Sequence, residues 1–409
     1  MKAIQYRKSV PRFLLVKLFS RWWPGIATGP LGCVGLRDLP EPELPKATWV
    51  KITPVLSGIC GSDLATVYAK GSPYFSPLTS CPFVLGHETV GRVKEVGSDV
   101  DTVAVGDRVV IEPALGCRVR GIDPLCPPCR AGTHANCENV TQGDISAGIQ
   151  TGYCRDTGGV WSGCFVAHHS QLHRVPDSMP DRVAVLVEPA ACAVHAALKM
   201  ETEYPETIVL IGCGAMGLLT LAALRFLGCR SRILASAWLP AQAEYAKSLG
   251  ADAVTLARGK ELYRTVREFT GASEYRAEIG KPYLFGGPPV IFDCVGSGES
   301  IDDALRLTSA RGRVVLVGMP GIPRGVDWTP IWHKELRVMG SYAYGTETYN
   351  GRSVGTFHLA IEFLSETGEK VGPLVGAEFP LSEYRRALVA ALFPQQTGAV
   401  KTVFDLGQG

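Results

Sequence analysis

The sequence predicts an α/β protein with two parts, an antiparallel β domain followed by a doubly wound parallel sheet. Residues 47–56 and 88–111 are rich in Val, Ile and Thr and are interrupted at short intervals by Gly and Asp. This pattern is typical of antiparallel strands joined by tight turns. After about residue 185, short apolar runs alternate with helical stretches instead, which favours a parallel sheet.

The second part is expected to begin with a buried strand at 207–211 and to alternate regularly from there. The expected series is helix 215–227, strand 231–236, helix 240–249, strand 253–256, helix 259–270, strand 290–293, helix 299–309 and strand 313–318. The tail has helical stretches at 354–367 and 382–392 and a final strand at 399–405, and it is expected to rejoin the first domain. The predicted division is 1–186, 187–342 and a C-terminal segment 343–409.

Two segments look inserted. Residues 9–32 are basic and aromatic and predict a helix. The simplest interpretation is a surface helix whose Phe, Leu and Trp side chains pack on the body or on another subunit. A lid over the active site and a membrane-surface anchor are the alternatives. Residues 274–289 are rich in Pro and Gly and predict a loop between a helix and a strand, without an assignable role.

Composition excludes several classes of protein. The 409 residues are 46% hydrophobic and 20% charged, which is ordinary for a soluble globular protein. A net charge of +2 is too balanced for a protein that binds nucleic acid by neutralising phosphates. No apolar run approaches the roughly 18–20 residues of a membrane span. Thirteen cysteines without a secretory signal predict thiols or metal ligands in a reducing, cytoplasmic compartment.

One loop, within residues 112–140, has the spacing of a structural zinc site. Cys126, Cys129 and Cys137 follow the pattern Cys-x2-Cys-x7-Cys among Pro, Gly and Asn. Three thiolates at these intervals can surround one tetrahedral Zn²⁺, which needs a fourth ligand. Cys117 is the preferred fourth ligand, because a thiolate suits a closed site better than the alternative, Asp123.

A second constellation is of the catalytic type. Cys60 lies in GICGSD, His87 and Glu88 lie in GHE, and Glu188 lies in VEPAACAVHA. Each motif alone is weak, since a single Cys or His usually belongs to a core. Together they supply a Cys/His/carboxylate set, and three protein ligands leave one zinc position open for water or substrate.

A glycine-rich turn predicts a dinucleotide site. Gly212-Cys213-Gly214-Ala215-Met216-Gly217 follows the apolar strand and opens an apolar helix. In this context Gly212 allows the tight turn, Gly214 lets the backbone approach a pyrophosphate, and Gly217 permits close packing of helix and strand. The helix N-terminus supplies the anion site.

Taken together, these motifs resemble the zinc-dependent medium-chain alcohol dehydrogenase family. The likeness covers about residues 34–405 apart from the inserted segments, and the motifs follow the family's order. Glu188-Pro189 is similar to the sorbitol and threonine dehydrogenase branch, where a Glu replaces a Cys; Cys192 is the alternative ligand. The resemblance implies a GroES-like antiparallel β domain with the catalytic site and a Rossmann domain that binds NAD(P).

The resemblance also implies two zinc ions per chain, one catalytic and one structural. Cys60, His87 and Glu188 correspond to the catalytic ligands, and Glu88 corresponds to a neighbouring carboxylate that can move onto the metal. The structural zinc corresponds to the cysteine loop, which here needs to be longer because the family's motif usually begins at the position of Asp123.

Three other residues receive roles from the same resemblance. Asp63 matches the acid that orients the ligating His. Ser62 matches the hydroxyl that hydrogen-bonds the substrate oxygen and begins the proton relay. Lys401, in the last strand, matches a basic residue that contacts the cofactor pyrophosphate.

The sequence departs from the family at two functional positions. Ala65 stands where many members carry a His three residues after the relay Ser, so the proton leaves by water, Thr66 or Glu88. The acid that would bond the ribose 2′-hydroxyl of NAD falls at Ala237 and is missing. Arg258 could reach a 2′-phosphate instead. With nothing to repel that charge, the cofactor preference leans to NADP.

The resulting hypothesis is hydride transfer between NAD(P) and a secondary alcohol or polyol, or its ketone or aldehyde. Tyr68, Tyr153 and Trp161 are candidates for the substrate wall, although Trp161 could equally belong to the core. Relatives form homodimers or homotetramers through an edge strand, expected here at 313–318. The alternatives are a zinc-independent quinone or enone reductase, an inactive nucleotide-binding protein and a redox-sensing cysteine protein.

Overall fold

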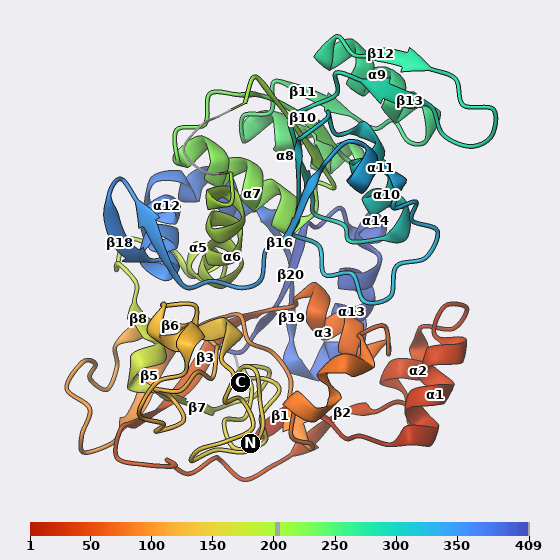
Figure 1. Cartoon of the computed structure of the whole chain (residues 1–409). Helices are drawn as coiled ribbons and strands as arrows, with labels where there is room; N and C mark the ends of the chain where they lie inside the picture. Colours follow the sequence, from red (N-terminus) through yellow and green to blue (C-terminus); the bar gives the residue numbers. More distant parts are fainter. Residues whose placement is uncertain (201–204, 408–409) are drawn as a thin grey trace. The chain divides into compact units, whose positions relative to one another are not determined.

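The computed structural model describes residues 1–200 and 205–407. The chain forms two compact units, one of Met1–Glu188 with Tyr344–Gly409 and one of Pro189–Ala343 (Figure 1). Among the described residues, no helix is both long enough and apolar enough to cross a membrane.

The first unit is built on a largely antiparallel sheet of seven strands. In spatial order they are β19 (Val375–Pro380), β20 (Lys401–Asp405), β3 (Trp49–Gly58), β5 (Thr89–Val96), β6 (Arg108–Ile111) and β8 (Leu172–Arg174), with β7 (Phe165–His168) paired to β3. A second sheet has the order β2 (Val34–Asp38), β1 (Lys2–Tyr6) and β4 (Phe83–Val84). The C-terminal β20 pairs antiparallel with β3, so the tail completes the sheet of the first unit.

Alternation along β3 explains its position in the core. Val50 and Ile52 are buried while Lys51 and Thr53 are partly exposed, as expected when successive side chains point to opposite faces. The core of the unit adds aromatic side chains such as Trp161, and Phe404 of β20.

Eight α-helices, of which α12 is the longest, and one hairpin belong to the described part of the first unit. They are α1 (Val10–Phe19), α2 (Gly25–Thr28), α3 (Gly61–Val67), α4 (Pro127–Arg130), α5 (Asp181–Ala184), α12 (Thr356–Val371), α13 (Tyr384–Leu392), α14 (Pro394–Thr397) and the hairpin β17 (Thr346–Tyr349) with β18 (Arg352–Gly355). Helix α6 (Val187–Leu198) begins in this unit.

The second unit contains a six-stranded parallel sheet. Its spatial order is β11 (Ala253–Thr255), β10 (Arg232–Ser236), β9 (Thr207–Ile211), β14 (Val290–Asp293), β15 (Arg313–Leu316) and β16 (Arg337–Gly340). Counted along the chain, this is the order 3-2-1-4-5-6 of a dinucleotide-binding fold. All five residues of β9, Thr-Ile-Val-Leu-Ile, are buried, as a central strand covered on both faces requires.

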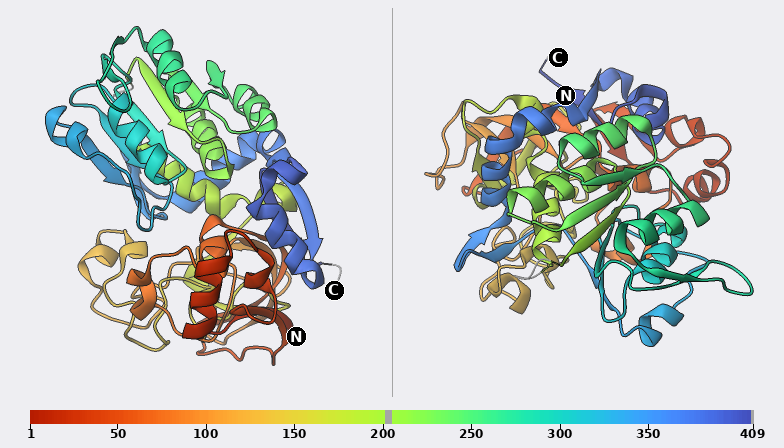
Figure 2. Two further views of the ribbon diagram at one scale, coloured as in Figure 1. Left: turned by 90° about the vertical axis from the view of Figure 1, so that its right-hand side faces the viewer. Right: turned by 90° about the horizontal axis from the view of Figure 1, so that it is seen from above.

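Helices cover both faces of this sheet (Figure 2). They are α7 (Ala215–Phe226), α8 (Pro240–Ser248), α9 (Lys260–Thr270), α10 (Gly298–Leu307) and α11 (Thr329–His333). Apolar residues of α9 and α10, among them Val266 and Ile301, form one core with Val209 and Ile291 of the strands.

Two expectations about the second unit are wrong. Residues 274–289 are not only a loop, because β12 (Ser273–Tyr275) and β13 (Tyr283–Phe285) pair there as an antiparallel hairpin. Strand β15, expected at the edge of the sheet, has β16 on its outer side. The segment Arg337–Gly340 has only two apolar side chains, Val338 and Met339, and no buried apolar run, so the sequence does not mark it as a strand.

The inserted segment 9–32 is helical, as expected, but its apolar side chains do not all pack on the body of the protein. Val16 is buried, whereas Leu18, Trp22 and Trp23 are at least 60% exposed. The interpretation of a helix packed by its Phe, Leu and Trp face on the rest of this chain is therefore wrong for these side chains.

Candidate active site and structural metal site

Three of the predicted metal ligands lie together in the first unit. Cys60 precedes the first turn of α3, while His87 and Glu88 lie just before β5. The ligand atoms of these three residues are all within 4.8 Å of one another. Glu188, at the start of α6, is buried and is not part of this group, although its carboxyl is close enough to be influenced by the charges of His87 and Glu88.

Asp63 supports both Cys60 and His87. Its side chain is fully buried, and Oδ2 accepts a hydrogen bond from the backbone N–H of Cys60 at 3.0 Å. Its Oδ1 lies 3.4 Å from Nδ1 of His87. Burial lowers the pKa of His87, but the charge of Asp63 outweighs this effect and raises that pKa well above its usual value. The site therefore favours a positive charge on or at the imidazole.

Lys401 lies against Glu88, a contact that the sequence did not predict. The two side chains form an ion pair and are both at most 5% exposed. Gly58, at the end of β3, makes room for this pair, since a Cβ there would lie 1.9 Å from Oε2 of Glu88 and 3.0 Å from Cε of Lys401. Burial lowers the pKa of Lys401, but the carboxylate of Glu88 raises it overall, so the ammonium is retained.

The charges of this pocket fit a bound cation. The buried acids Asp63, Glu88 and Glu188 and the thiol of Cys60 lie around two basic side chains, those of His87 and Lys401. Burial and the charge of Glu88 raise the pKa of Glu188 despite His87 and Lys401. An excess of buried acids is costly without a counter-charge, and a Cys, a His and a carboxylate are the donors that zinc prefers.

The hydroxyl of Ser62 points toward this cluster, with Oγ 3.5 Å from Nε2 of His87. Thr66 and Tyr153 lie behind it. Their hydroxyl oxygens are 2.9 Å apart, and each donates to the backbone carbonyl of Ser62, at 3.1 and 3.2 Å. This pair adjoins Ala65, where the expected relay His is missing. The sequence suggested water, Thr66 or Glu88 as the proton exit and Tyr153 as part of the substrate wall, but not the contact between Thr66 and Tyr153.

Of the three candidates for the substrate wall, only Tyr153 lies at the cluster, with its ring 6.4 Å from that of His87. Trp161 is fully buried, donates to the carbonyl of Gly58 at 2.9 Å and packs edge-on against Phe404, so it belongs to the core. Tyr68 is also a core residue, 1% exposed.

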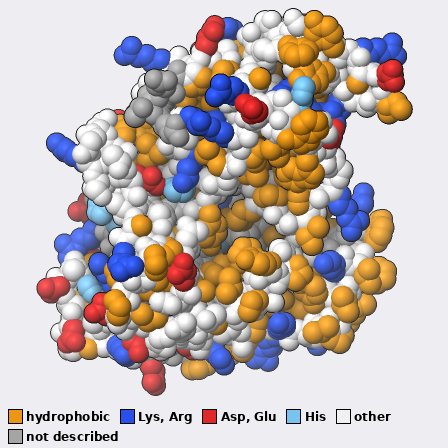
Figure 3. Space-filling model, viewed as in Figure 1, with side chains coloured by type: hydrophobic (Ala, Val, Ile, Leu, Met, Phe, Trp, Pro, Cys, Tyr) orange, Lys and Arg blue, Asp and Glu red, His pale blue; other side chains and the backbone are white. Residues whose placement is uncertain are grey.

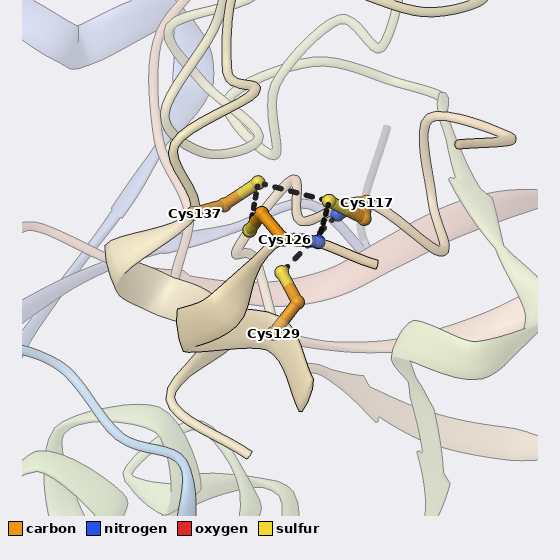
Figure 4. Close-up of side chains that lie close together, drawn as sticks. All are labelled: Cys117, Cys126, Cys129 and Cys137. Atoms are coloured by element: carbon orange, nitrogen blue, oxygen red, sulfur yellow. Dashed lines mark hydrogen bonds between the residues drawn. The ribbon is translucent and has the colours of Figure 1, made fainter. Parts of the chain in front are cut away.

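The cysteine loop brings four sulfurs together (Figure 4). Those of Cys117, Cys126, Cys129 and Cys137 all lie within 4.8 Å of one another, and Asp123 is not among them. Two sulfur–sulfur distances are 3.6 and 3.8 Å. Sulfurs at 2.3 Å from a tetrahedral zinc would be about 3.8 Å apart, so the arrangement fits that ion.

Hydrogen bonds to the sulfurs also fit thiolates. Backbone N–H groups of Cys117, Cys126 and Asn139 donate to Cys129, Cys117 and Cys137, and the side-chain amide of Asn139 donates to Cys117. Burial raises the pKa of Cys129 and Cys137. These thiols therefore need a bound cation to be ionised at neutral pH.

Arg120 holds the loop that surrounds the four cysteines, a role that no motif of the sequence indicates. Its guanidinium is fully buried and donates to five backbone carbonyls at 2.7–3.3 Å. The acceptors belong to Leu115, Gln142, Ile145, Ser146 and Gly148. From sequence alone, an arginine in a loop is expected to be exposed to solvent.

In the second unit, the three predicted glycines occupy different environments. Gly212 has φ of +95°, and a Cβ there would meet Val295 at 2.4 Å. A Cβ on Gly217 would lie 1.8 Å from the carbonyl of Gly212, so helix α7 packs closely on the turn. A Cβ on Gly214 meets nothing within 4 Å. Ala215 and Met216 open α7 beside this open space.

The end of β10 presents a different group from the expected acid. Ala237 is buried, and its N–H donates to Thr255 at 2.8 Å. The next residue, Trp238, is 54% exposed and lies under the guanidinium of Arg258, at 5.0 Å from the ring centre. Of the two residues predicted to decide the cofactor preference, Ala237 is therefore a small buried side chain, and Arg258 is a cation stacked on Trp238.

Comparisons with known proteins agree with these sites. Residues 46–177 match the family model of the alcohol dehydrogenase GroES-like domain, and residues 215–359 match that of zinc-binding dehydrogenases. A zinc-type alcohol dehydrogenase-like protein of uncharacterized activity from Haemophilus influenzae is 32% identical over 336 residues, which are 81% of this chain and 84% of that protein.

Two further matches extend the comparison. A sorbitol dehydrogenase of Bombyx mori is 28% identical over 358 residues, which are 87% of this chain and 91% of the relative. The solved structure of galactitol-1-phosphate dehydrogenase from Escherichia coli superposes with a TM-score of 0.72 at 20% identity and covers 99% of this chain and 100% of that one.

Fold and site together define a zinc-binding dehydrogenase with a GroES-like and a Rossmann part. The chain belongs to the zinc-dependent medium-chain alcohol dehydrogenase family, in its sorbitol dehydrogenase-like branch. It is an oxidoreductase that uses zinc and NAD(P) with a small-molecule alcohol. The comparisons favour this activity over the zinc-independent reductase and the inactive protein.

Proposed function

We propose that the protein oxidises a secondary alcohol of a polyhydroxylated substrate, or reduces the matching ketone, at a zinc held by Cys60 and His87. The observation that carries this proposal is the convergence of Cys60, His87 and Glu88 within 4.8 Å, with Asp63 buried behind His87. The likeness to a sorbitol dehydrogenase supports a polyol-type substrate.

The third ligand is a carboxylate. Nδ1 of His87 faces Asp63, which leaves Nε2 for the metal. Glu188 is the proposed resident ligand, and Glu88, now paired with Lys401, is the carboxylate that exchanges onto the metal. Cys192 stays the alternative to Glu188.

The surrounding residues orient the reactants and move a proton. When bound, zinc supplies the Lewis acidity that lowers the pKa of a substrate hydroxyl, and nicotinamide supplies the hydride acceptor or donor. The Ser62 hydroxyl takes the substrate proton. Thr66 and Tyr153 fix the backbone of Ser62 and so hold its side chain toward the site. With Ala65 in place of a relay His, water carries the proton onward.

The cofactor part of the proposal concerns the second unit. Gly212, Gly214 and Gly217 with the N-terminus of α7 receive the pyrophosphate. Arg258, stacked on Trp238, favours NADP, because a guanidinium can hold a 2′-phosphate and no acid at Ala237 repels it. In this division, residues 1–186 with the segment 343–409 form the catalytic domain and residues 187–342 bind the cofactor.

Three further properties belong to the same proposal. The chain carries two zinc ions, the second on Cys117, Cys126, Cys129 and Cys137. It works in a reducing, cytoplasmic compartment, which the set of free cysteines supports. It forms a homodimer or homotetramer, for which β16 rather than β15 supplies the edge strand of the parallel sheet.

Zinc content of the purified protein tests the metal assignment. We expect two zinc ions per chain, falling to one in Cys60→Ser with loss of turnover. The control is Cys81→Ser, which changes a half-buried cysteine outside both clusters and should keep two. One zinc in both the wild type and Cys60→Ser would refute the catalytic site. Loss in Cys192→Ser but not in Glu188→Gln would move the third ligand to Cys192.

Substrate assays test the chemistry. Sorbitol, xylitol and simple secondary alcohols are offered with NADP and with NAD, and the ketones with the reduced cofactors. Zinc-dependent turnover of polyols supports the proposal. The proposal would be contradicted if the protein oxidised no alcohol but reduced an enone or quinone, and if this reduction persisted without the catalytic zinc.

A further inference from the structure

The first 37 residues carry charge of one sign only. They contain seven cations, Lys2, Arg7, Lys8, Arg12, Lys17, Arg21 and Arg37, and no Asp or Glu. This is unusual in a chain whose net charge is only +2. The part from Arg7 to Gly32, which contains α1 and α2, is called the α1–α2 segment below.

The α1–α2 segment also exposes large apolar side chains. Trp22 is 77% exposed, and Trp23 and Leu18 are each 60% exposed. The other large apolar side chains of α1 that reach solvent are Val10, Leu14, Leu15 and Phe19. Figure 3 shows orange and blue side chains next to one another over α1 and α2, at the lower right. Contiguous exposed apolar side chains of this size usually mark a surface that binds something.

The segment is held in place despite this exposure. Val16 is buried in the core of the first unit, and Ser20 donates to the carbonyl of Tyr68 at 3.4 Å. Tyr384 of α13 donates to the carbonyl of Thr28 at 3.1 Å. Leu18 is therefore exposed on a helix that is anchored to the core, and Trp22 and Trp23 are exposed in the turn that joins α1 to α2.

A cavity of about 250 Å³ lies where the segment meets β2 and α13. Three guanidinium groups line it, those of Arg12, Arg37 and Arg385, together with the backbone of Gly29 and Gly32. None of the lining residues is acidic. Within the described part of the chain, the buried Nε of Arg37 has no hydrogen-bond partner.

This cavity has the chemistry of a phosphate site. Three like charges around one space repel one another unless an anion enters, and guanidinium groups bind phosphate oxygens in pairs. Arg12 lies on α1 itself, on the same helix as Leu14 and Leu18. A ligand that fills the cavity and also contacts the helix would need an anionic head and an apolar part.

We propose that the α1–α2 segment docks the protein on an anionic phospholipid membrane. Trp22, Trp23 and Leu18 enter the interfacial layer, Lys17 and Arg21 lie among the headgroups, and the cavity of Arg12, Arg37 and Arg385 receives a lipid phosphate. Apolar insertion and a basic cluster are the two signals that reversible surface binding requires. The docking does not depend on the substrate of the enzyme.

Charge favours this partner over a second copy of the chain. Two α1–α2 segments facing each other would bring cations against cations with no carboxylate from either, which is unfavourable. A lipid surface supplies the missing negative charge and accepts Trp side chains at its polar boundary.

Vesicle binding tests the proposal. The full chain is mixed with vesicles of phosphatidylcholine containing about one-third phosphatidylglycerol, and with vesicles of phosphatidylcholine alone. We expect sedimentation with the anionic vesicles only, weakening at high salt because exposed charges are screened. The double variant Leu18→Glu/Trp22→Glu should bind at least tenfold more weakly. The matched control is Trp332→Glu, which changes a 71% exposed Trp of the second unit and should bind as the wild type.

The cavity is tested separately. Arg37→Gln and Arg385→Gln should each reduce binding to anionic vesicles by several fold. Inorganic phosphate at millimolar concentration should compete only partly, because it lacks the apolar contact. If phosphate binds the cavity as tightly as vesicles bind the protein, the site is one for a free anion and the membrane proposal is wrong.

Two other results would overturn the proposal. One is no binding to either vesicle by a folded, zinc-loaded chain. The other is a wild-type dimer that Leu18→Glu/Trp22→Glu converts to monomer while vesicle binding is absent or unchanged, which would assign the surface to a second copy. Thermal unfolding and zinc content of each variant show that the change is local.

Discussion

Gly58 contributes to the candidate active site by having no side chain, which leaves room for Glu88 and Lys401. Any side chain at the end of β3 would enter the volume that Glu88 and Lys401 fill, since a Cβ would lie 1.9 Å from the Glu88 carboxylate. The strand conformation itself would accept alanine, because Gly58 is not among the glycines with positive φ. The glycine is therefore required by the ion pair and not by the backbone.

We predict that Gly58→Ala displaces Glu88 and breaks its contact with Lys401. Over-packing of this kind costs about 1–3 kcal/mol of unfolding free energy, and the affinity for the proposed catalytic zinc should fall with it. Urea unfolding and zinc titration measure the two effects. Gly340→Ala is the control, because a Cβ there meets nothing within 4 Å. Equal stability of the two variants would show that the pair tolerates the methyl group.

For single residues, the sequence could identify the candidate metal ligands but not the side chains that contact them. Cys60, His87 and the four loop cysteines could be proposed from spacing and residue type alone, because metal ligands must be Cys, His or carboxylates. Nothing in the spacing brings Lys401 to Glu88 across 313 positions of chain, or pairs Thr66 with Tyr153. The first contact depends on how β3, β5 and β20 lie side by side, and the second on how the loop that carries Tyr153 packs against α3.

In the turn between β9 and α7, Gly214 and Gly217 are glycines for different reasons. A side chain on Gly217 would strike the carbonyl of Gly212 at 1.8 Å, whereas one on Gly214 would point into open space. Only Gly214 therefore has no structural reason to be glycine within the protein. That open space is where the proposed pyrophosphate would approach the backbone.

We predict that Gly214→Ala keeps the stability of the cofactor-free protein but weakens NADP binding by at least about tenfold, roughly 1.4 kcal/mol. Gly217→Ala should lower both stability and affinity, because α7 must move away from the turn. Fluorescence titration with NADPH and thermal unfolding without cofactor distinguish the two. Unchanged affinity in Gly214→Ala would remove the cofactor from this turn.

The conformation of the cysteine loop depends on the guanidinium group of Arg120. Arg120 satisfies five backbone carbonyls that have no sheet or helix to pair with. We predict that Arg120→Met costs about 3 kcal/mol or more, because several buried carbonyls lose their donor together. Release of zinc to a chelator should also be faster than from the wild type.

The neighbouring Arg118 provides the control for that prediction. It is exposed, so Arg118→Met should change stability by no more than about 0.5 kcal/mol. If Arg120→Met were equally harmless, water would be replacing the guanidinium and the loop would not depend on it.

Helices and strands could be predicted where several successive residues share one pattern of apolar and polar side chains. The apolar run at β9 and the glycines after it define the parallel sheet without ambiguity, and the alternating residues of β3 define the antiparallel one. The strands that were missed lack a buried apolar run. Ser273–Tyr275 is exposed throughout and Arg337–Gly340 is at most partly buried, whereas the equally short Val290–Asp293 is buried throughout and was predicted.

For the molecule as a whole, the two compact units separate the two kinds of bound group. Both candidate metal clusters, with Cys60 and with Cys117, belong to the unit of Met1–Glu188 and Tyr344–Gly409. The glycine turn and Arg258 belong to the unit of Pro189–Ala343. Zinc and cofactor should therefore stabilise different parts of the chain.

Hydrogen exchange measured by mass spectrometry can test this separation. Chelation should speed amide exchange most in residues 112–148, where the loop depends on its four cysteines, and should leave β9 and α7 protected. Adding NADP should slow exchange at residues 212–217 without affecting the cysteine loop. The Cys129→Ser variant should reproduce the chelated pattern in that loop with zinc present. Faster exchange through β9 after chelation alone would mean that the second unit depends on zinc, against the division of roles inferred from the two units.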